Sequence, residues 1–116
     1  MKTFLALFMG SGNPADAAAF EAAPDRDARV GQGMAAWGQW MADHATSIVD
    51  SGGPVGKTKR TGRDGVSDIS NTVGGYVVLQ AESHEAAAQM FLNHPHFMIF
   101  PGDRVEIMER LPIPGQ

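Results

Sequence analysis

Three stretches of the chain predict β-strands: the first two are rich in aromatic and aliphatic residues, and the third alternates between apolar and polar residues. Residues 3–9 are mostly aromatic and aliphatic, residues 73–81 read VGGYVVLQA, and residues 104–111 read RVEIMERL. Between the first two stretches, residues 55–70 predict a pair of short polar strands, because the Asp-Gly pair within TGRDGV is typical of a hairpin turn. We expect this hairpin to lie at an edge of the sheet.

Three other segments show features of helices. From about residue 27 to residue 50, apolar residues recur every three or four positions and form the stripe of an amphipathic helix: Val30, Met34, Trp37, Met41, Ala45 and Ile48. A shorter helix over about residues 14–22 is indicated by the Asn-Pro pair at its start. A third helix begins after Ser83 and ends at or just before His94, because the proline that follows disfavours helical geometry there.

We interpret the order of these elements as β-α-β-β-α-β, with an extra short helix early in the chain. This is the ferredoxin-like plan, an α+β fold in which both crossover helices lie on one face of an antiparallel sheet. A length of 116 residues suits one domain with one core. We therefore expect a single domain over residues 1–116, with an insertion at about residues 11–26.

Both faces of the predicted sheet are apolar. The first strand alternates between two apolar sets, Leu5, Leu7 and Met9 on one side and Phe4, Ala6 and Phe8 on the other. In the same way, Tyr76 and Val78 alternate with Val77 and Leu79. Since the helices cover one face, and an exposed apolar patch of this kind usually marks an interface, we predict a homodimer packed sheet to sheet. The alternative is that the early helix or the C-terminal tail covers the second face.

Charge and composition exclude several classes of partner. The net charge is −4, and the one basic cluster alternates with small polar residues: Lys57, Lys59, Arg60 and Arg63. We interpret it as a solvated hairpin edge rather than a phosphate site, and no nucleic-acid partner is predicted. The apolar run at residues 4–9 is too short for a signal peptide, and no run of residues suits a membrane span. The absence of cysteine leaves no disulfide or thiolate site and is compatible with a reducing cytoplasm.

The long helix carries four residues that could line a cleft: Trp37, Trp40, Met41 and His44. Trp40 and His44 lie four residues apart on the flank of the apolar stripe, and Trp37 lies one turn earlier. The alternative for the Trp-His pair is boundary packing with a satisfied histidine. Asp43 and Asp50 fall nearly opposite the stripe and should face water.

The segment NHPHFMIF, residues 93–100, places two histidines around a proline. In a structural role, the proline ends the helix and the apolar residues behind it, Phe97, Ile99 and Phe100, fill the core. In a functional role, an imidazole with a pKa of roughly 6.5 suits proton transfer, and His96 is freer to face a pocket than His94, which precedes the proline. Zinc could bind both and His44, but two loop histidines without an assured third ligand are a weak signal. We predict no metal and no cofactor.

Four stretches of the chain resemble the YCII-related family: KTFLALFMG, IVDSGGPVG, GGYVVLQAESHEAAAQMF and HPHFMIFPGDRVEIMERLPI. The resemblance covers nearly all of the sequence outside residues 11–26 and implies a dimeric α+β barrel fold. It also implies proton transfer or elimination on small, often cyclic, substrates by a His/Asp pair. That histidine would fall at or next to Ala36 and that aspartate at His94, so this chain keeps neither.

Two functional hypotheses follow. The first is a dimeric module that binds a small apolar or aromatic molecule between the long helix, the loop after the last helix and the sheet. Its ligand-binding residues would be Trp37, Trp40, Met41, His44, Tyr76 and Phe100. The second is a cofactor-independent acid/base enzyme of lyase or isomerase type, with His96 moving a proton and His94 assisting.

Overall fold

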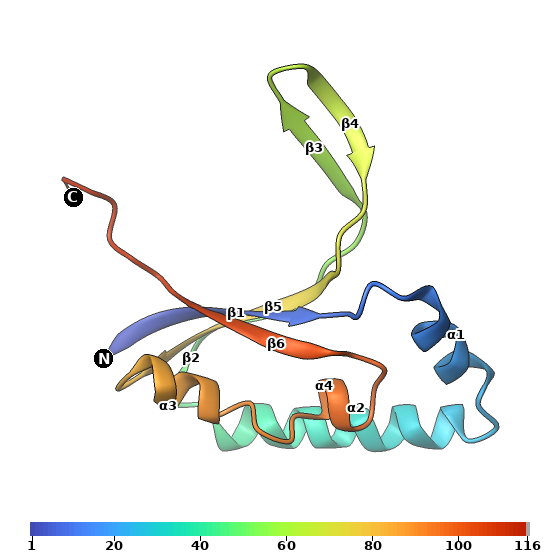
Figure 1. Ribbon diagram of the computed structural model, residues 1–116. Coiled ribbons are helices and arrows are strands. Elements are labelled where there is room, and N and C mark those ends of the chain that lie inside the picture. Colours follow the sequence, from blue (N-terminus) through green and yellow to red (C-terminus); the bar gives the residue numbers. More distant parts are fainter. Residues whose placement is uncertain (116) are drawn as a thin grey trace.

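A computed structural model describes residues 1–115 of the protein (Figure 1). Four strands form one antiparallel sheet in the order β2-β5-β1-β6. They are β1 (Lys2–Met9), β2 (Ile48–Pro54), β5 (Val73–Ala81) and β6 (Arg104–Glu109). The helices are α1 (Pro14–Ala22), α2 (Arg26–Asp43), α3 (His84–Gln89) and α4 (Pro95–Met98). Strands β3 (Thr58–Gly62) and β4 (Gly65–Ile69) form a separate two-stranded hairpin.

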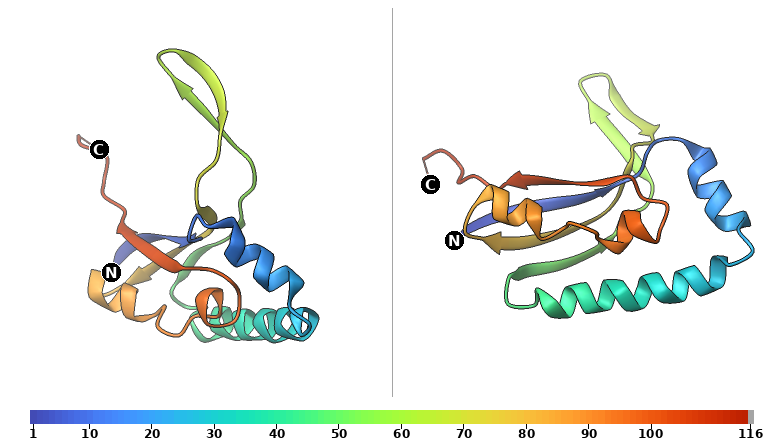
Figure 2. Two further views of the ribbon diagram at one scale, coloured as in Figure 1. Left: turned by 45° about the vertical axis from the view of Figure 1, so that its right-hand side comes forward. Right: turned by 60° about the horizontal axis from the view of Figure 1, so that its bottom comes forward.

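The predicted fold class is confirmed. The elements β1-α2-β2-β5-α3-β6 follow the ferredoxin-like order, with β1 and β5 at the centre of the antiparallel sheet. Helices α2, α3 and α4 all lie on one side of this sheet (Figures 1 and 2). Within residues 1–115, none of the helices is both long and apolar enough to cross a membrane.

The boundary between the long helix and the next strand differs from the sequence prediction. Helix α2 ends at Asp43, and β2 begins at Ile48, which the apolar spacing had placed on the helix. Ile48 pairs with Leu79 of β5 and packs against the core, so pairing with the sheet overrides the helical spacing. The hairpin is also not at an edge of the main sheet, because β2 occupies the edge next to β5.

Helix starts follow the predicted capping pattern. The Oδ1 atom of Asn13 accepts the N–H of Ala15 at 3.0 Å, and α1 has the predicted bounds. The Ser83 hydroxyl likewise accepts the N–H of Ala86 at 3.0 Å at the start of α3. His94 has an extended backbone before Pro95, as predicted, but the sequence prediction missed α4, the short helix that begins there.

The covered face of the sheet forms the core with the helices. Its buried side chains are Phe4, Ala6, Phe8, Val77 and Leu79, and they pack against Trp40, Ala87 and Phe91. Phe4 and Leu79 are both 0% exposed. At about 25 cal/mol per Å² of apolar surface removed from water, this layer is the main source of stability.

The opposite face, which we call the open face, includes Leu5, Leu7, Val78 and Met108. The first three are only partly buried, and Met108 is 43% exposed. Helix α1 lies beyond the end of the sheet, and the C-terminal tail after β6 leads away from it (Figure 1). The tail residues Leu111 and Ile113 are 71% and 69% exposed. Neither segment covers the open face within residues 1–115, so that alternative is wrong.

Candidate functional site

A cavity of about 410 Å³ lies between α2, the α4 segment and the end of the sheet where β2, β5 and β1 meet. We call it the main cavity. Its lining side chains and backbone come from Phe8, Met34, Trp37, Met41, Ser51, Gly53, Pro54, Gly74, Gly75, Tyr76, Val77, His96 and Phe100. A volume of this order is that of a small-molecule site rather than a packing defect.

The lining of the main cavity is aromatic and aliphatic. Phe8 and Trp37 are in contact, with ring centroids 4.8 Å apart, and Phe100 lies 6.2 Å from Trp37. Met34 and Met41 add flexible thioethers, which adapt to ligands of different shape. Among the lining residues, none is Asp, Glu, Lys or Arg. The wall of the cavity is therefore apolar and carries no side chain of these four charged types.

Gly33 shapes the wall on the side of α2. A Cβ atom at this position would overlap the ring of Phe100, and Gly33 is one of the two buried residues of the helix. Phe100 in turn contacts Phe20 of α1 at 6.1 Å between ring centroids, and Arg29 lies over the Phe20 ring. The glycine, unfavourable in a helix by up to about 1 kcal/mol, is thus required by close packing beside the cavity.

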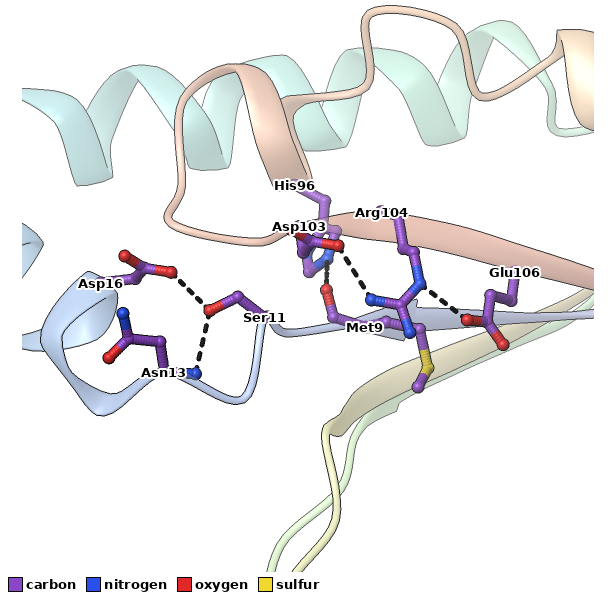
Figure 3. A network of polar contacts seen from close by, with 8 residues as sticks. All are labelled: Met9, Ser11, Asn13, Asp16, His96, Asp103, Arg104 and Glu106. Atoms are coloured by element: carbon purple, nitrogen blue, oxygen red, sulfur yellow. Dashed lines mark hydrogen bonds and ion pairs between the residues drawn. The ribbon is translucent and has the colours of Figure 1, made fainter.

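His96 is the one imidazole on the main cavity among the described residues. Its Nε2 atom lies 2.8 Å from the carbonyl oxygen of Met9, which also accepts the N–H of Asp103 at 2.9 Å (Figure 3). A carbonyl only accepts, so Nε2 carries the proton and the neutral ring has a free lone pair on Nδ1. The edge of the ring lies against Gly102, where a Cβ atom would overlap it.

The other contacts drawn in Figure 3 lie in two segments near His96, residues 11–16 and residues 103–106. Asp103 and Glu106 both bond to Arg104, at 2.8 and 2.7 Å, where β6 begins. Ser11 bonds to Asp16 at the start of α1. A second cavity of about 390 Å³ lies on this polar side and shares Gly74 and His96 with the main cavity. His96 therefore lies between the two cavities.

His94, only two residues away, is 0% exposed and is not part of the cavity lining. Its Nδ1 atom accepts the N–H of His96 at 3.0 Å and so caps α4. Its Nε2 atom has no hydrogen-bond partner among the described residues. The ring is enclosed by Trp37, Trp40 and Phe8, with centroids 4.6, 4.8 and 5.1 Å away.

Burial among these rings decides the charge of His94. It lowers the pKa of His94 from 6.5 to about 4, and the neighbouring charges of His96 and His44 act in the same direction. His94 is therefore a neutral capping group at pH 7. The sequence hypothesis that His94 assists proton transfer from the cavity has no geometric support, because the ring does not reach the cavity.

Trp40 and His44 are also absent from the cavity lining. The indole N–H of Trp40 donates to the carbonyl oxygen of Met90 at 2.8 Å, which fixes the ring in the core. His44 stacks on Trp40 at 4.5 Å between centroids, and its Nδ1 atom lies 2.8 Å from the Trp40 carbonyl oxygen. Boundary packing with a satisfied histidine, the alternative left open by the sequence, describes this pair.

Of the candidate residues, the structure thus brings His96, Trp37, Met41, Tyr76 and Phe100 to one cavity. His44, His94 and His96 do not form a metal-binding group, since residues 1–115 contain no cluster of three potential metal ligands. Sequence reasoning missed Phe8, Met34 and Val77, and also the backbone of β2 and β5 at Gly53 and Gly75. A Cβ atom at Gly75 would lie 3.0 Å from the Gly53 oxygen. Paired glycines within a strand could have signalled this close approach.

Comparisons with known proteins support the fold. No family model matches the chain, and no curated protein matches it significantly. Among solved structures, the chain is similar to 5-chloro-2-hydroxyhydroquinone dehydrochlorinase from Burkholderia phenoliruptrix AC1100, solved in complex with 2,5-dihydroxybenzoquinone. The two share 19% identity with a TM-score of 0.55, over 95% of this chain and 93% of the other. Agreement at this identity establishes a shared fold.

Proposed function

We propose that this protein binds a small, neutral, aromatic or apolar molecule in the main cavity. The observation that carries the proposal is a cavity of about 410 Å³ whose wall is aromatic and thioether, with His96 as its imidazole. Phe8, Trp37 and Phe100 offer ring faces and edges for stacking. The Nδ1 atom of His96 would accept a hydrogen bond from a hydroxyl group on the guest. The similar structure that holds 2,5-dihydroxybenzoquinone lends support, because that guest is also a small hydroxylated ring.

A thermal-shift panel tests the binding proposal. Phenol, catechol and hydroquinone serve as neutral probes, and benzoate serves as the charged control, because none of the residues that line the main cavity is Lys or Arg to balance its carboxylate. A probe at 100 times its dissociation constant should stabilise the protein by about 2.7 kcal/mol. Trp37→Ala should remove the response, whereas Val66→Ala on the exposed hairpin should keep it. A flat response to every neutral ring, or an equal response to benzoate, contradicts the proposal.

The second candidate function is acid/base catalysis by His96. It is favoured by the hydrogen bond from Nε2 to the Met9 carbonyl oxygen, which leaves Nδ1 as the basic atom of the neutral ring. In such a step, a carbon acid bound in the cavity gives its proton to Nδ1 and keeps the electron pair as an enolate. Reprotonation from Nδ1 after exchange with solvent completes the cycle without a cofactor.

Deuterium exchange separates the two candidates. A cyclic 1,2-dione in D₂O should exchange its α-hydrogen faster in the presence of the protein, as measured by proton NMR. His96→Gln should keep the thermal response to neutral rings and lose the accelerated exchange. Equal exchange rates with His96→Gln and with the unchanged protein would remove the catalytic candidate and leave the binding one.

We further propose that the chain is a relative of the YCII-related family and forms a homodimer through the open face. The order and spacing of the four stretches quoted above support the first part. The partly buried apolar residues Leu5, Leu7 and Val78, together with the exposed Met108, support the second. Light scattering at micromolar concentration should give the mass of two chains. A mass of one chain throughout that range contradicts the dimer.

A further inference from the structure

The β3–β4 hairpin stands apart from the body of the protein. It forms a two-stranded sheet of its own, joined to the main sheet by residues 55–57 and 70–72. It projects to the side opposite the helices, as does the C-terminal tail, so the open face lies between the two (Figures 1 and 2). Every residue of its two strands is exposed except Thr58 and Gly62. An isolated two-stranded hairpin is marginally stable in water, so this one gains from a partner surface.

The hairpin and the body carry opposite net charge. Residues 57–70, which are the hairpin and one connecting residue on each side, contain four cationic and two anionic side chains, a net charge of +2. Because the whole chain has a net charge of −4, the remainder carries −6. Lys59 and Arg60 are paired within the hairpin, with Asp68 at 2.6 Å and Asp64 at 3.1 Å.

The two remaining cations of the hairpin are Lys57 and Arg63. Both are exposed, and neither has a carboxylate within ion-pair distance in residues 1–115. Their charges are thus directed to the surroundings of the molecule. A surface that carries excess negative charge, such as the body of another copy of this chain, is their natural complement.

We propose that the hairpin is an arm that docks on the acidic body of a second copy when two open faces pack together. The inference rests on the proposed dimer and adds to it the contact that aligns the two subunits. A copy seated on the open face lies on the side to which the hairpin projects. Twofold symmetry then gives both arms the same contact. Lys57 and Arg63, which belong to the basic cluster interpreted from the sequence as a solvated hairpin edge, then become part of a subunit contact.

Matched charge variants test the arm. Lys57→Gln with Arg63→Gln lowers the net charge by two and disrupts neither ion pair within the hairpin. Ala28→Glu with Ala35→Glu lowers it by the same amount at exposed positions on α2, a helix on the other side of the sheet. We expect the arm variant to raise the dimer dissociation constant about tenfold, because each of two symmetric arms loses two cations. The α2 variant should leave it within about twofold.

Salt and truncation provide independent readings by sedimentation equilibrium. Raising NaCl from about 0.05 M to about 0.5 M should weaken the unchanged dimer and have little effect on the arm variant, because salt screens exposed charges. Replacing residues 57–70 by Gly-Gly should weaken the dimer more than the arm variant does.

The outcomes separate the arm from the dimer. An unchanged protein that is monomeric overturns both proposals. A dimer whose dissociation constant is the same in the arm variant, the α2 variant and the truncated chain overturns the arm and leaves the dimer standing.

Discussion

The two faces of the sheet are made of the same kinds of residue, but they differ in how far they are buried. On β1, Phe4 and Phe8 are buried beneath helices, while Leu5 and Leu7, the residues beside them, stay partly exposed. Apolar alternation therefore shows only that both faces need cover. It does not show whether the cover comes from the same chain. The position of the helices decides this, and it also sets the main cavity on the covered side.

The largest effect should come from truncating the covered face. Leu79 is 0% exposed, so Leu79→Ala should lower the free energy of unfolding by about 2–5 kcal/mol, from lost burial and the space left behind. Urea denaturation at a protein concentration below the dissociation constant of the proposed dimer measures this loss. Leu7→Ala makes the same chemical change on the open face and should cost less than about half as much in the isolated subunit. Equal losses would mean that the open face is already covered.

A second comparison concerns the pKa of His94, which is buried in the folded protein and reaches solvent in the unfolded chain. Its pKa is about 4 in the folded protein and 6.5 in the unfolded chain, so the unfolded chain binds more protons between these values. Folding stability should therefore fall as the pH drops from 6.5 to 4, by about 3 kcal/mol in total. Below pH 4, His94 is protonated in both the folded and the unfolded state, so the loss of stability is complete and grows no further.

Urea denaturation across this pH range provides the measurement. The matched variant is His94→Asn, which keeps a side chain able to cap α4 and does not titrate. Its stability should depend less on pH between 6.5 and 4. An unchanged slope would show that His94 is not the group responsible for the acid sensitivity.

The next effect compares two glycines of α2. Gly33 faces Phe100 at the cavity wall, while no atom lies within 4 Å of a Cβ at the exposed Gly38. Gly33→Ala should destabilise the protein by about 1–3 kcal/mol through overpacking and weaken binding of neutral rings as Phe100 moves. Gly38→Ala should instead stabilise it by about 0.5–1 kcal/mol, because alanine is the better helix residue. Thermal unfolding of both variants measures whether each substitution raises or lowers the stability. If both substitutions stabilise the protein, the close packing of Phe100 against Gly33 is contradicted.

These contrasts also show what the sequence could and could not predict. Alternation and capping residues predicted β1, β5 and both helix starts, because these depend on local patterns. The start of β2 at Ile48 depends on pairing with β5, a contact distant in sequence, so spacing alone misled.

At the site, the spacing of Trp37 and Met41 indicated the side of α2 that lines the main cavity. Trp40 does not line the cavity as the sequence predicted, because one side of the helix faces both the core and the cavity. Only its hydrogen bond to the Met90 carbonyl oxygen shows that Trp40 belongs to the core. Which of the two histidines faces the cavity was inferred from the restriction before proline. Their different chemistry depends on the Met9 carbonyl and on the aromatic enclosure of His94, neither of which a motif can show.

The smallest effect concerns the orientation of His96. A Cβ atom at Gly102 would overlap both the ring edge and the backbone oxygen of His96, so Gly102→Ala should displace the imidazole and weaken its bond to Met9. A hydrogen bond contributes about 0.5–1.5 kcal/mol net, so affinity for a neutral phenol should fall by about two- to tenfold. Isothermal titration measures this change, and ¹⁵N NMR should show the His96 tautomer losing its single preference. The control is Gly56→Ala, where no atom lies within 4 Å of the added carbon. If Gly102→Ala keeps both the affinity and the tautomer, the orientation of His96 does not depend on this contact.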